Sequence, residues 1–417
     1  MRLTDPDAPL LRQVCARLDD TGLTRLGVAV SGGGDSTALL HLLAACAPDH
    51  SVALEAATVD HGLRPGSANE AATVAATCAG LGITHQTLRW HGWDGSGNLQ
   101  AEARAARYRL LAAWAGAQGL DAVALGHTRD DVAETFVMRL GRAAGVDGLA
   151  TMADDFHRHG ARFLRPALGL GRDALRGFLR RHGLGWADDP SNDDPRFDRV
   201  KARKALETLA DLGIAPETLA EVADNLAETR ATLRQITADT ARTLARQQAG
   251  DVVIDRAALA RIAPGIARRL LLAALGWVSG ADYAPRREAL AGLERAIAAG
   301  RAHTLHGCLI QPGDTDLRVS REYAAVKHLA TPLTAPWDNR WQVTGPDPAL
   351  TVAALGEGLR DCPDWRDTGL PRTTLMASPA VWDGPRLIAA PLAGLAQGHA
   401  ATIHPSRGDF FTYALSH

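Results

Sequence analysis

Six consecutive residues, Ser31-Gly32-Gly33-Gly34-Asp35-Ser36, carry the strongest chemical signal in this sequence of 417 residues. The apolar run 26–30 precedes them and a helical pattern follows from Thr37, so they predict a loop between a strand and a helix. Three glycines let backbone N–H groups approach an anion, two hydroxyls add donors, and the helix presents its positive dipole end. The loop is therefore expected to hold a phosphate or a pyrophosphate.

The Asp35 carboxylate distinguishes this loop from the common nucleotide-triphosphate loop, G-x-x-x-x-G-K-[ST], in which a Lys contacts the β- and γ-phosphates. No Lys occupies the corresponding place here. A carboxylate beside phosphates implies a bridging Mg²⁺, because this ion is held by one or two carboxylates together with substrate phosphates. Asp35 is thus a candidate metal ligand and catalytic residue.

A second polar group, formed by His127, Asp131 and Glu134, follows a strand predicted over 121–125. Asp131 and Glu134 are three residues apart, so both carboxylates lie on one side of the first helical turn. The helix dipole alone favours acidic residues there. Beside a phosphate loop, however, two carboxylates and a His indicate Mg²⁺ ligation or a base that deprotonates an attacking amine. We therefore predict Asp131 and Glu134 as catalytic and Asp131 as a second metal ligand.

Asp60 and His61 follow another predicted strand, 52–59, and could line an adenine or ribose pocket. Taken alone, they are more typical of a turn with a hydrogen-bonded His. The neighbouring motifs favour nucleotide binding.

Two groups of arginines could hold anions. Arg104, Arg107 and Tyr108 share one face of a predicted helix, which is either a solvated basic face or a clamp on phosphate or RNA with Tyr108 available for stacking. Arg199 and Arg203 follow the turn 189–192 with helical spacing. They could hold a phosphate or a substrate carboxylate, although Pro-Ser-Asn turns are often only helix N-caps. The spacing leaves both alternatives open.

The elements that must position these residues alternate between strand-like and helical runs over the first two hundred residues. This alternation predicts an α/β fold with a doubly wound parallel sheet. The expected strands are 26–30, 52–59, 83–88 and 121–125, and the expected helices are 36–47, 69–81, 99–118 and 130–140. Ligands of such sheets bind outside the carboxyl ends of the strands, where the strand order switches.

We expect three domains from the length and from the turn-rich stretch 187–195. They are a nucleotide-binding domain over 1–210, a mainly helical domain over 211–330 and a small α+β domain over 331–417. The middle domain is predicted to contain helices at 216–248, 268–278 and 286–299, and a hairpin over 303–322 that turns at Pro312-Gly313-Asp314.

Composition narrows the class of protein. Apolar residues make up 46% of the chain, no apolar run approaches ~18 residues, and the N-terminus lacks a signal-type core, so we expect a cytoplasmic protein without membrane spans. The net charge of −2 means that any nucleic acid must bind to local basic surface. The five scattered cysteines form no C-x-x-C pair for zinc or an iron–sulfur cluster and are expected to be unpaired core residues.

Five segments together resemble one known family. S-G-G-x-D-S, V-x-H-G-L-R, N-x-Q-x-x-A-R-x-x-R-Y, G-H-T-x-D-D-x-x-E-T and D-D-P-S-N occur in this order and at the intervals typical of the tRNA(Ile)-lysidine synthetases. These enzymes belong to the PP-loop, or N-type ATP pyrophosphatase, superfamily. The resemblance is strong over 26–205 and weaker over 303–322 and 365–390. It implies a PP-loop domain, a substrate-recognition domain and a C-terminal domain.

The resemblance also implies a reaction in two steps. ATP adenylates the carbonyl oxygen at carbon 2 of cytidine 34 in tRNA-Ile with a CAU anticodon, and pyrophosphate leaves. The ε-amine of L-lysine then attacks this carbon and expels AMP, which gives lysidine and changes codon specificity from AUG to AUA and the identity of the tRNA from Met to Ile. A homodimer is possible.

By resemblance, each candidate residue receives a role. ATP is assigned to Ser31, Gly32, Gly33, Gly34, Asp35, Ser36, Asp60, His61 and His127; Mg²⁺ to Asp35 and Asp131; and AMP, lysine or tRNA to Arg104, Arg107, Tyr108, Arg199 and Arg203. Five residues depart from the family pattern. Thr58 stands where His is common, Ala143 and Ala144 replace the Gly and Ser of R-G-S-G, and Val200 and Ala202 replace the Asn and Ile of R-N-x-I-R.

Two other functions remain as alternatives. A PP-loop tRNA thiolase also adenylates a base but delivers sulfur, which requires reactive cysteines or a cluster site that this sequence lacks. A regulatory module that only binds nucleotide would not need Asp35, Asp131 and Glu134.

Overall fold

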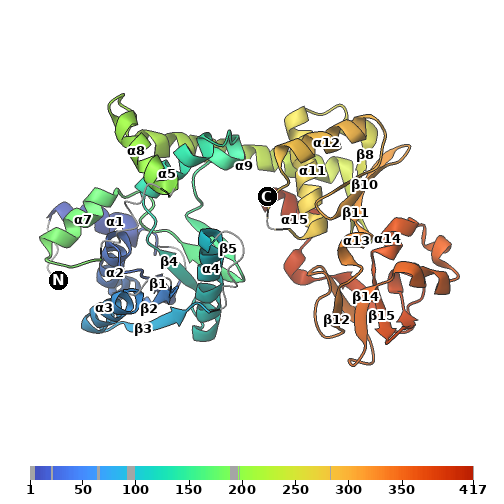
Figure 1. The fold of residues 1–417 in the computed structure, drawn as a ribbon, viewed down its shortest axis with the longest axis horizontal. Coiled ribbons are helices and arrows are strands. Elements are labelled where there is room, and N and C mark those ends of the chain that lie inside the picture. The colour runs from blue at the N-terminus through green and yellow to red at the C-terminus, as the bar shows by residue number, and fades with distance from the viewer. Residues whose placement is uncertain are drawn as a thin grey trace. The chain divides into compact units, whose positions relative to one another are not determined.

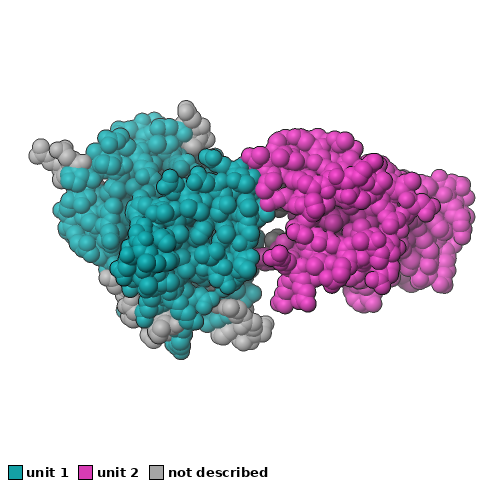
Figure 2. Space-filling view, turned by 90° about the horizontal axis from the view of Figure 1, so that it is seen from above, with its two compact units in different colours: residues 1–230 teal, residues 231–417 magenta. Residues whose placement is uncertain are grey.

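The computed structural model describes residues 5–19, 22–62, 66–91, 99–187, 196, 198–281 and 283–416. The chain divides into two compact units, residues 1–230 and 231–417, which are coloured separately in Figure 2. The division falls within one long helix, α9 (Pro216–Leu244). The domain boundaries at 210 and 330 stay predictions.

A six-stranded sheet forms the centre of the first unit, in the order β3-β2-β1-β4-β6-β5 (Figure 1). Five strands are parallel, and β5 runs antiparallel to β6. Their bounds are β1 Arg25–Ala29, β2 Ala53–Asp60, β3 Thr84–Arg89, β4 Ala122–Leu125, β5 Asp155–Arg158 and β6 Ala161–Leu164. The chain goes from β1 to β2 and β3 on one side and returns to β4 on the other, so the strand order switches between β1 and β4. The predicted parallel α/β sheet is confirmed.

Helices cover both faces of this sheet, because its buried side chains alternate between two apolar clusters. Val28 of β1 packs with α1 (Ala8–Cys15), α2 (Gly34–Cys46), α3 (Ser67–Gly80) and α7 (Arg172–Arg181). The next residue, Ala29, packs on the other face with α4 (Leu99–Gln118). This period of two is what a strand buried on both faces requires.

A third cluster joins the helices that follow β4. Phe136 of α5 (Arg129–Leu140) packs with Leu206 of α8 (Asp198–Ala210) and Leu219 of α9. The short helix α6 (Val146–Leu149) follows α5. Packing of α5 against α8 brings two helices that are far apart in sequence to the same end of the sheet.

The second unit contains helices and three antiparallel sheets. The five-stranded sheet has the order β7-β8-β11-β10-β9, a four-stranded sheet has β12-β14-β15-β16, and β13 pairs with β17. The strands are β7 Ala245–Gln248, β8 Asp251–Asp255, β9 His303–Leu305, β10 Cys308–Pro312, β11 Asp316–Arg321, β12 Ala330–Pro332, β13 Trp341–Thr344, β14 Thr351–Ala354, β15 Pro379–Asp383, β16 Arg386–Ala389 and β17 Ala400–Ile403. The helices are α10 Arg256–Leu259, α11 Pro264–Ser279, α12 Arg287–Ala298, α13 Tyr323–Val326, α14 Arg372–Met376 and α15 Phe410–Ser416.

The middle of the chain therefore has more strand than predicted. Helices α11 and α12 and the β10–β11 hairpin are confirmed. The prediction of one helix to residue 248 is wrong at its end, because β7 begins at Ala245. Ala249 and Gly250 adopt left-handed φ values of 50° and 80°, which turn the chain into β8.

The cysteine prediction is wrong for one pair. Cys15 of α1 and Cys46 of α2 form a disulfide across 31 residues, because α1 packs on α2. Cys78, Cys308 and Cys362 are buried free thiols, as expected. Among the helices of the described residues, none combines the length and the apolar character that a membrane span requires.

Candidate active site

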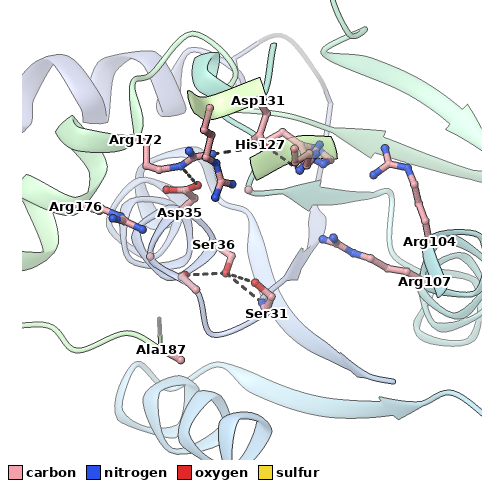
Figure 3. A pocket seen from close by; sticks show the side chains of 15 residues that line it. Ser31, Asp35, Ser36, Arg104, Arg107, His127, Asp131, Arg172, Arg176 and Ala187 are labelled. Carbon is pink, nitrogen blue, oxygen red and sulfur yellow. Dashed lines mark hydrogen bonds and ion pairs between the residues drawn. The ribbon is translucent and has the colours of Figure 1, made fainter. Parts of the chain in front are cut away.

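A cavity of about 340 Å³ lies at the carboxyl ends of β1 and β4, where the strand order switches (Figure 3). The phosphate loop, the turn after β4 and side chains from five helices line it. These residues are Ser31, Gly33, Gly34, Asp35, Ser36, Arg104, Arg107, Gly126, His127, Asp131, Arg172, Arg176, Ala187, Arg199 and Arg203. Six arginines outnumber two carboxylates, so the lining suits a polyanion.

Internal hydrogen bonds hold the phosphate loop against the start of α2. The Ser36 Oγ accepts the N–H of Ser31 at 3.1 Å and donates to the carbonyl of Gly33 at 3.1 Å. Gly32 has a left-handed φ of 86°, which suits Gly. A Cβ on Gly126 would lie 2.8 Å from the Cα of Ser36, so Gly at this position lets the turn after β4 approach the loop. The sequence thus shapes an anion site at a helix N-terminus.

Asp35 lines the cavity, and one of its two carboxylate oxygens has no hydrogen-bond partner among the described residues. Its Oδ2 accepts a hydrogen bond from Arg172 Nε at 3.2 Å, whereas Oδ1 is buried and accepts none from the residues that the structure describes. Burial raises the pKa of Asp35, although the charge of Arg172 opposes this effect. A carboxylate with a spare oxygen and a raised pKa is suited to receive a cation or a proton.

Asp131 has the opposite environment. Its Oδ2 accepts the Thr128 N–H at 2.9 Å, and the Thr128 side chain accepts the Asp131 N–H in return, so the two residues form a capping box. The Thr128 hydroxyl also lies 3.1 Å from Oδ2, and Oδ1 accepts from Arg199 at 3.1 Å. Burial pushes the pKa of Asp131 upward, but the charges of Arg199 and Arg172 and the hydrogen bond from the Thr128 N–H outweigh it, so the pKa is lowered. Asp131 is therefore an ionised carboxylate in a fixed orientation.

Glu134 lies beneath the cavity and does not line it. The side chain is fully buried, and its Oε1 accepts from Arg172 at 3.0 Å and from Arg203 at 2.7 Å, while no described residue donates to Oε2. The catalytic role of Glu134 stays a prediction. From its buried position, Oε1 orients the Arg172 and Arg203 guanidinium groups, and both of these residues line the cavity.

Arg172 is a site residue that the sequence did not reveal. It contacts Asp35 and Glu134, and its Nη2 lies 3.8 Å from Asp131 Oδ1. Burial alone would lower the pKa of Arg172, but the charges of these three carboxylates outweigh it, so the pKa is raised. Arg172 is the first residue of α7, where the helix dipole disfavours a cation. An arginine in the first turn of a helix is therefore the sequence feature that could have indicated acidic groups near Arg172.

The remaining predicted arginines also line the cavity. Arg104 and Arg107 extend from α4, and Arg199 and Arg203 extend from α8. Burial, together with the charges of Arg104 and Arg199, lowers the pKa of Arg107. An anion that binds here would relieve this repulsion.

Tyr108 does not line the cavity, although the Arg104 Cζ lies 5.5 Å from the centroid of its ring. Its side chain is 3% exposed and packs edge-to-face on Phe163 with the ring centroids 5.2 Å apart. The predicted stacking of Tyr108 on a base is therefore not available, because the helix turns this residue into the core.

Asp60 and His61 lie outside the lining of this cavity. The Asp60 carboxylate accepts the N–H of Gly62 at 2.9 Å, and the His61 ring packs edge-on against Trp90 at 5.6 Å. Burial lowers the pKa of His61. Residues 63–65 and the 188–192 motif are outside the described residues.

His127 lines the cavity beside Asp131. Its Nδ1 accepts a hydrogen bond from Arg165 Nε at 3.0 Å. Burial and the nearby charges of Arg107 and Arg165 lower the pKa of His127, although Asp131 opposes them. The imidazole is therefore neutral at pH ~7.

The departures from the family pattern are accommodated locally. The Thr58 hydroxyl donates to the Val30 carbonyl at 2.8 Å and contacts His85 Nε2 at 2.9 Å, which ties β2 to the strand before the loop. Ala143 adopts a left-handed φ of 53°, a conformation that the usual Gly would favour. Val200 and Ala202 are buried in α8, and Arg199 and Arg203 still reach the cavity.

The donor set is compatible with Mg²⁺. No group of three or more His, Cys, Asp or Glu side chains that could hold a metal is found in the described part of the chain. Magnesium bound through substrate phosphates needs only one or two carboxylates. The unpartnered Oδ1 of Asp35, with Asp131 on the same wall, meets this requirement.

Comparison with known proteins agrees with this geometry. A family model described as a PP-loop domain matches residues 7–209. A tRNA(Ile)-lysidine synthase from Ruegeria pomeroyi is 51% identical over 100% of both chains. Enzymes of the same name from Rhizobium meliloti and Mesorhizobium japonicum are 36% and 40% identical, over 90% and 79% of this chain and 85% and 74% of their own lengths. The chain therefore belongs to the tRNA(Ile)-lysidine synthase family.

Proposed function

We propose that this chain uses ATP to join L-lysine to carbon 2 of cytidine 34 in tRNA-Ile with a CAU anticodon. The arginine-lined cavity over the phosphate loop is the observation that carries the proposal, since it provides an anion site with two carboxylates beside it. The full-length similarity to tRNA(Ile)-lysidine synthases supports the choice of RNA and amino acid.

In the first step, the loop and the start of α2 would bind the pyrophosphate that leaves. Backbone N–H groups and the hydroxyls of Ser31 and Ser36 donate to its oxygens, and the Arg172 and Arg176 guanidinium groups offset its charge. The cytidine oxygen attacks the α-phosphorus, and the bond between the α-phosphorus and the bridging oxygen to the β-phosphate breaks. Asp35 and Asp131 would hold Mg²⁺, which supplies further charge neutralisation.

In the second step, the lysine ε-amine attacks carbon 2 and the bond to AMP breaks. The amine must lose a proton, and the acceptor needs a pKa matched to this transfer. Asp35 is the better candidate once pyrophosphate has left, because its pKa is raised and its Oδ1 has no described partner. Asp131 is a poorer base, because both of its oxygens already accept hydrogen bonds.

The thiolase alternative gains no support from the described cysteines. Cys15 and Cys46 are joined in a disulfide, and neither residue lines the cavity. Cys78, Cys308 and Cys362 are buried, and burial raises the pKa of Cys78 to about 11 and that of Cys308 to about 12. Such thiols are inert at neutral pH.

The direct test measures incorporation of labelled lysine into unmodified tRNA-Ile(CAU) by the purified protein. We expect incorporation only when ATP and Mg²⁺ are both present, with one AMP formed per lysine joined. The matched control is the same tRNA with a GAU anticodon, which lacks the target cytidine. Absence of lysine transfer to the CAU substrate, or transfer of sulfur, would refute the proposal. A homodimer stays a prediction for sedimentation measurements.

A further inference from the structure

We propose that Arg165 is a positioning residue that fixes the His127 imidazole as an Nε2–H donor facing the cavity. Arg165 directly follows β6 and does not line the cavity itself. Its Nε donates to His127 Nδ1 at 3.0 Å. Arg165 thus acts on the site only through its neighbour.

The chemistry of the guanidinium group determines the tautomer. Arginine carries five N–H donors, has no acceptor and stays protonated in proteins. The His127 Nδ1 must therefore be the acceptor in this hydrogen bond, and the single proton of the neutral ring is on Nε2. No described residue accepts a hydrogen bond from this Nε2, so its proton is available to a bound substrate.

The β5–β6 hairpin holds Arg165 in this orientation. The side chain is 7% exposed, its Nη1 donates to the carbonyl of Ala153, and its Cζ lies 4.1 Å from the centroid of the Phe156 ring. Three contacts on different atoms leave the guanidinium little freedom. The hairpin therefore has a role in the site, although it lies at the edge of the sheet.

His127 consequently donates a hydrogen bond and does not accept the amine proton. An N–H donor that faces the cavity stabilises an oxygen that gains negative charge during adenylyl transfer. This part of the inference rests on the proposed function, whereas the tautomer does not. The two can therefore be tested separately.

Nitrogen NMR of the full chain with ¹⁵N-labelled His tests the tautomer. The His127 signals are those lost in His127→Gln. We expect a protonated Nε2 and an unprotonated Nδ1 in the wild type, because the two nitrogen types differ widely in ¹⁵N shift. In Arg165→Met, a methyl group replaces the Nε donor at similar volume, and the proton should shift partly or wholly to Nδ1. An unchanged pattern would overturn the proposal whether or not the protein makes lysidine.

Kinetics then test whether Arg165 acts through His127. We expect Arg165→Met to lower kcat for lysine transfer by about 10- to 100-fold with the KM for ATP unchanged. Arg165→Lys, which keeps a donor-only side chain, should recover part of this loss. The double variant with His127→Gln should be no slower than His127→Gln alone, whereas multiplied losses would show an independent role and refute the proposal.

The matched control for these variants is Arg162→Met, on the same hairpin. Arg162 pairs with Asp155 at 2.6 Å on the exposed side, so its loss perturbs the hairpin without touching His127. It should leave kcat and the His127 signals as in the wild type. A loss equal to that of Arg165→Met would assign the effect to the hairpin as a whole and would also refute the proposal.

Discussion

At the scale of single residues, the two carboxylates that line the cavity have different environments, which shift their pKa values in opposite directions. Asp35 is half-buried, its buried Oδ1 has no hydrogen-bond partner among the described residues, and its pKa is raised. Asp131 is buried with both oxygens hydrogen bonded, and its pKa is lowered. Carboxylates whose pKa values are pushed apart can take different tasks in one reaction. Here Asp131 supplies fixed charge and Asp35 can exchange a proton or a cation.

The first prediction concerns Asp35→Asn, which keeps the size of the side chain but removes its charge. We expect pyrophosphate release with tRNA and ATP to fall by about two to three orders of magnitude, because a carboxylate at the reacting phosphates is lost. Release can be followed by a coupled phosphate assay. The control is Asp155→Asn on the exposed end of β5, which should leave the rate unchanged. Wild-type rates in Asp35→Asn would contradict both roles assigned to this residue.

The sequence predicted that residues of the phosphate loop and Asp131 of α5 belong to the site, but it did not predict Arg172. Glycines, a strand and a helix start are local features, so Ser31 to Ser36 could be recognised from the chain alone. Arg172 reaches Asp35 across 137 residues, and that contact exists only because α7 packs on α2. The burial of Glu134 outside the cavity lining could not be predicted either, because helical spacing gives the side of the helix but not how deeply a side chain lies.

At the scale of elements, the contact between the turn after β4 and the start of α2 sets the width of the site. A Cβ added to Gly126 would lie 2.8 Å from Ser36 Cα and 3.0 Å from its nitrogen, and both are backbone atoms that cannot rotate away. The two strand ends can therefore approach only because this residue has no side chain.

Gly126→Ala should push the turn and the loop apart. We expect a loss of about 1–3 kcal/mol in the free energy of unfolding and a higher KM for ATP, because the overpacked contact must shift. Urea denaturation and steady-state kinetics measure the two effects. Gly116→Ala within α4, where a Cβ would meet nothing within 4 Å, is the control and should be neutral or stabilising by about 0.5–1 kcal/mol. Equal behaviour of the two variants would show that the close approach is unimportant.

The elements themselves were predictable where their pattern was long. The parallel strands β1 to β4 and the helices α2 to α5 lie within two residues of the predicted limits. The β5–β6 hairpin was missed because each strand has four residues and the turn is His159-Gly160, with φ values of 51° and 81°, in place of the usual Asn-Gly. Helix α7 was not predicted, because its sequence is short and rich in arginine. Only three residues, Leu175, Phe178 and Leu179, form its buried apolar side.

At the scale of the whole molecule, one buried carboxylate joins the parts of the second unit. Asp251 of β8 accepts from Arg318 of β11 at 2.8 Å and from Thr374 of α14 at 2.5 Å. Burial nevertheless raises the pKa of Asp251 to about 6. Relative to its protonated form, the ionised carboxylate is thus less favourable in the folded protein than in the unfolded chain, where the carboxyl keeps its ordinary pKa.

This raised pKa predicts a pH dependence of stability. Between pH ~4 and ~6 the folded state holds a proton on Asp251 that the unfolded state has released, so the free energy of unfolding falls as pH rises, by roughly 3 kcal/mol in total, and is flat above that range. Urea denaturation across this range, compared between wild type and Asp251→Asn, isolates the effect, because the variant cannot titrate there. Parallel curves for the two proteins would contradict the prediction.

The charge of the whole chain determines how it must meet RNA. A net charge of −2 gives no long-range attraction to a polyanion, so affinity has to come from arginines gathered at one place. The cavity supplies such a place, with six arginines at one end of the sheet. Arg104 is exposed at this site. Arg25 is the first residue of the central strand β1, so it lies at the end of the strand opposite to the cavity, where it pairs with Glu55 at 2.5 Å.

The salt dependence of tRNA binding tests this view. Each phosphate contact that is lost lowers the slope of log K against log salt by about 0.7–0.9, because fewer counterions are released on binding. We expect Arg104→Ala to show this change in a titration of fluorescent tRNA-Ile(CAU), whereas Arg25→Ala should keep the wild-type slope. If Arg104→Ala weakened binding without changing the slope, Arg104 would contact a base or the nucleotide and not a phosphate of the tRNA. Unchanged affinity and slope would remove Arg104 from the RNA-binding surface altogether.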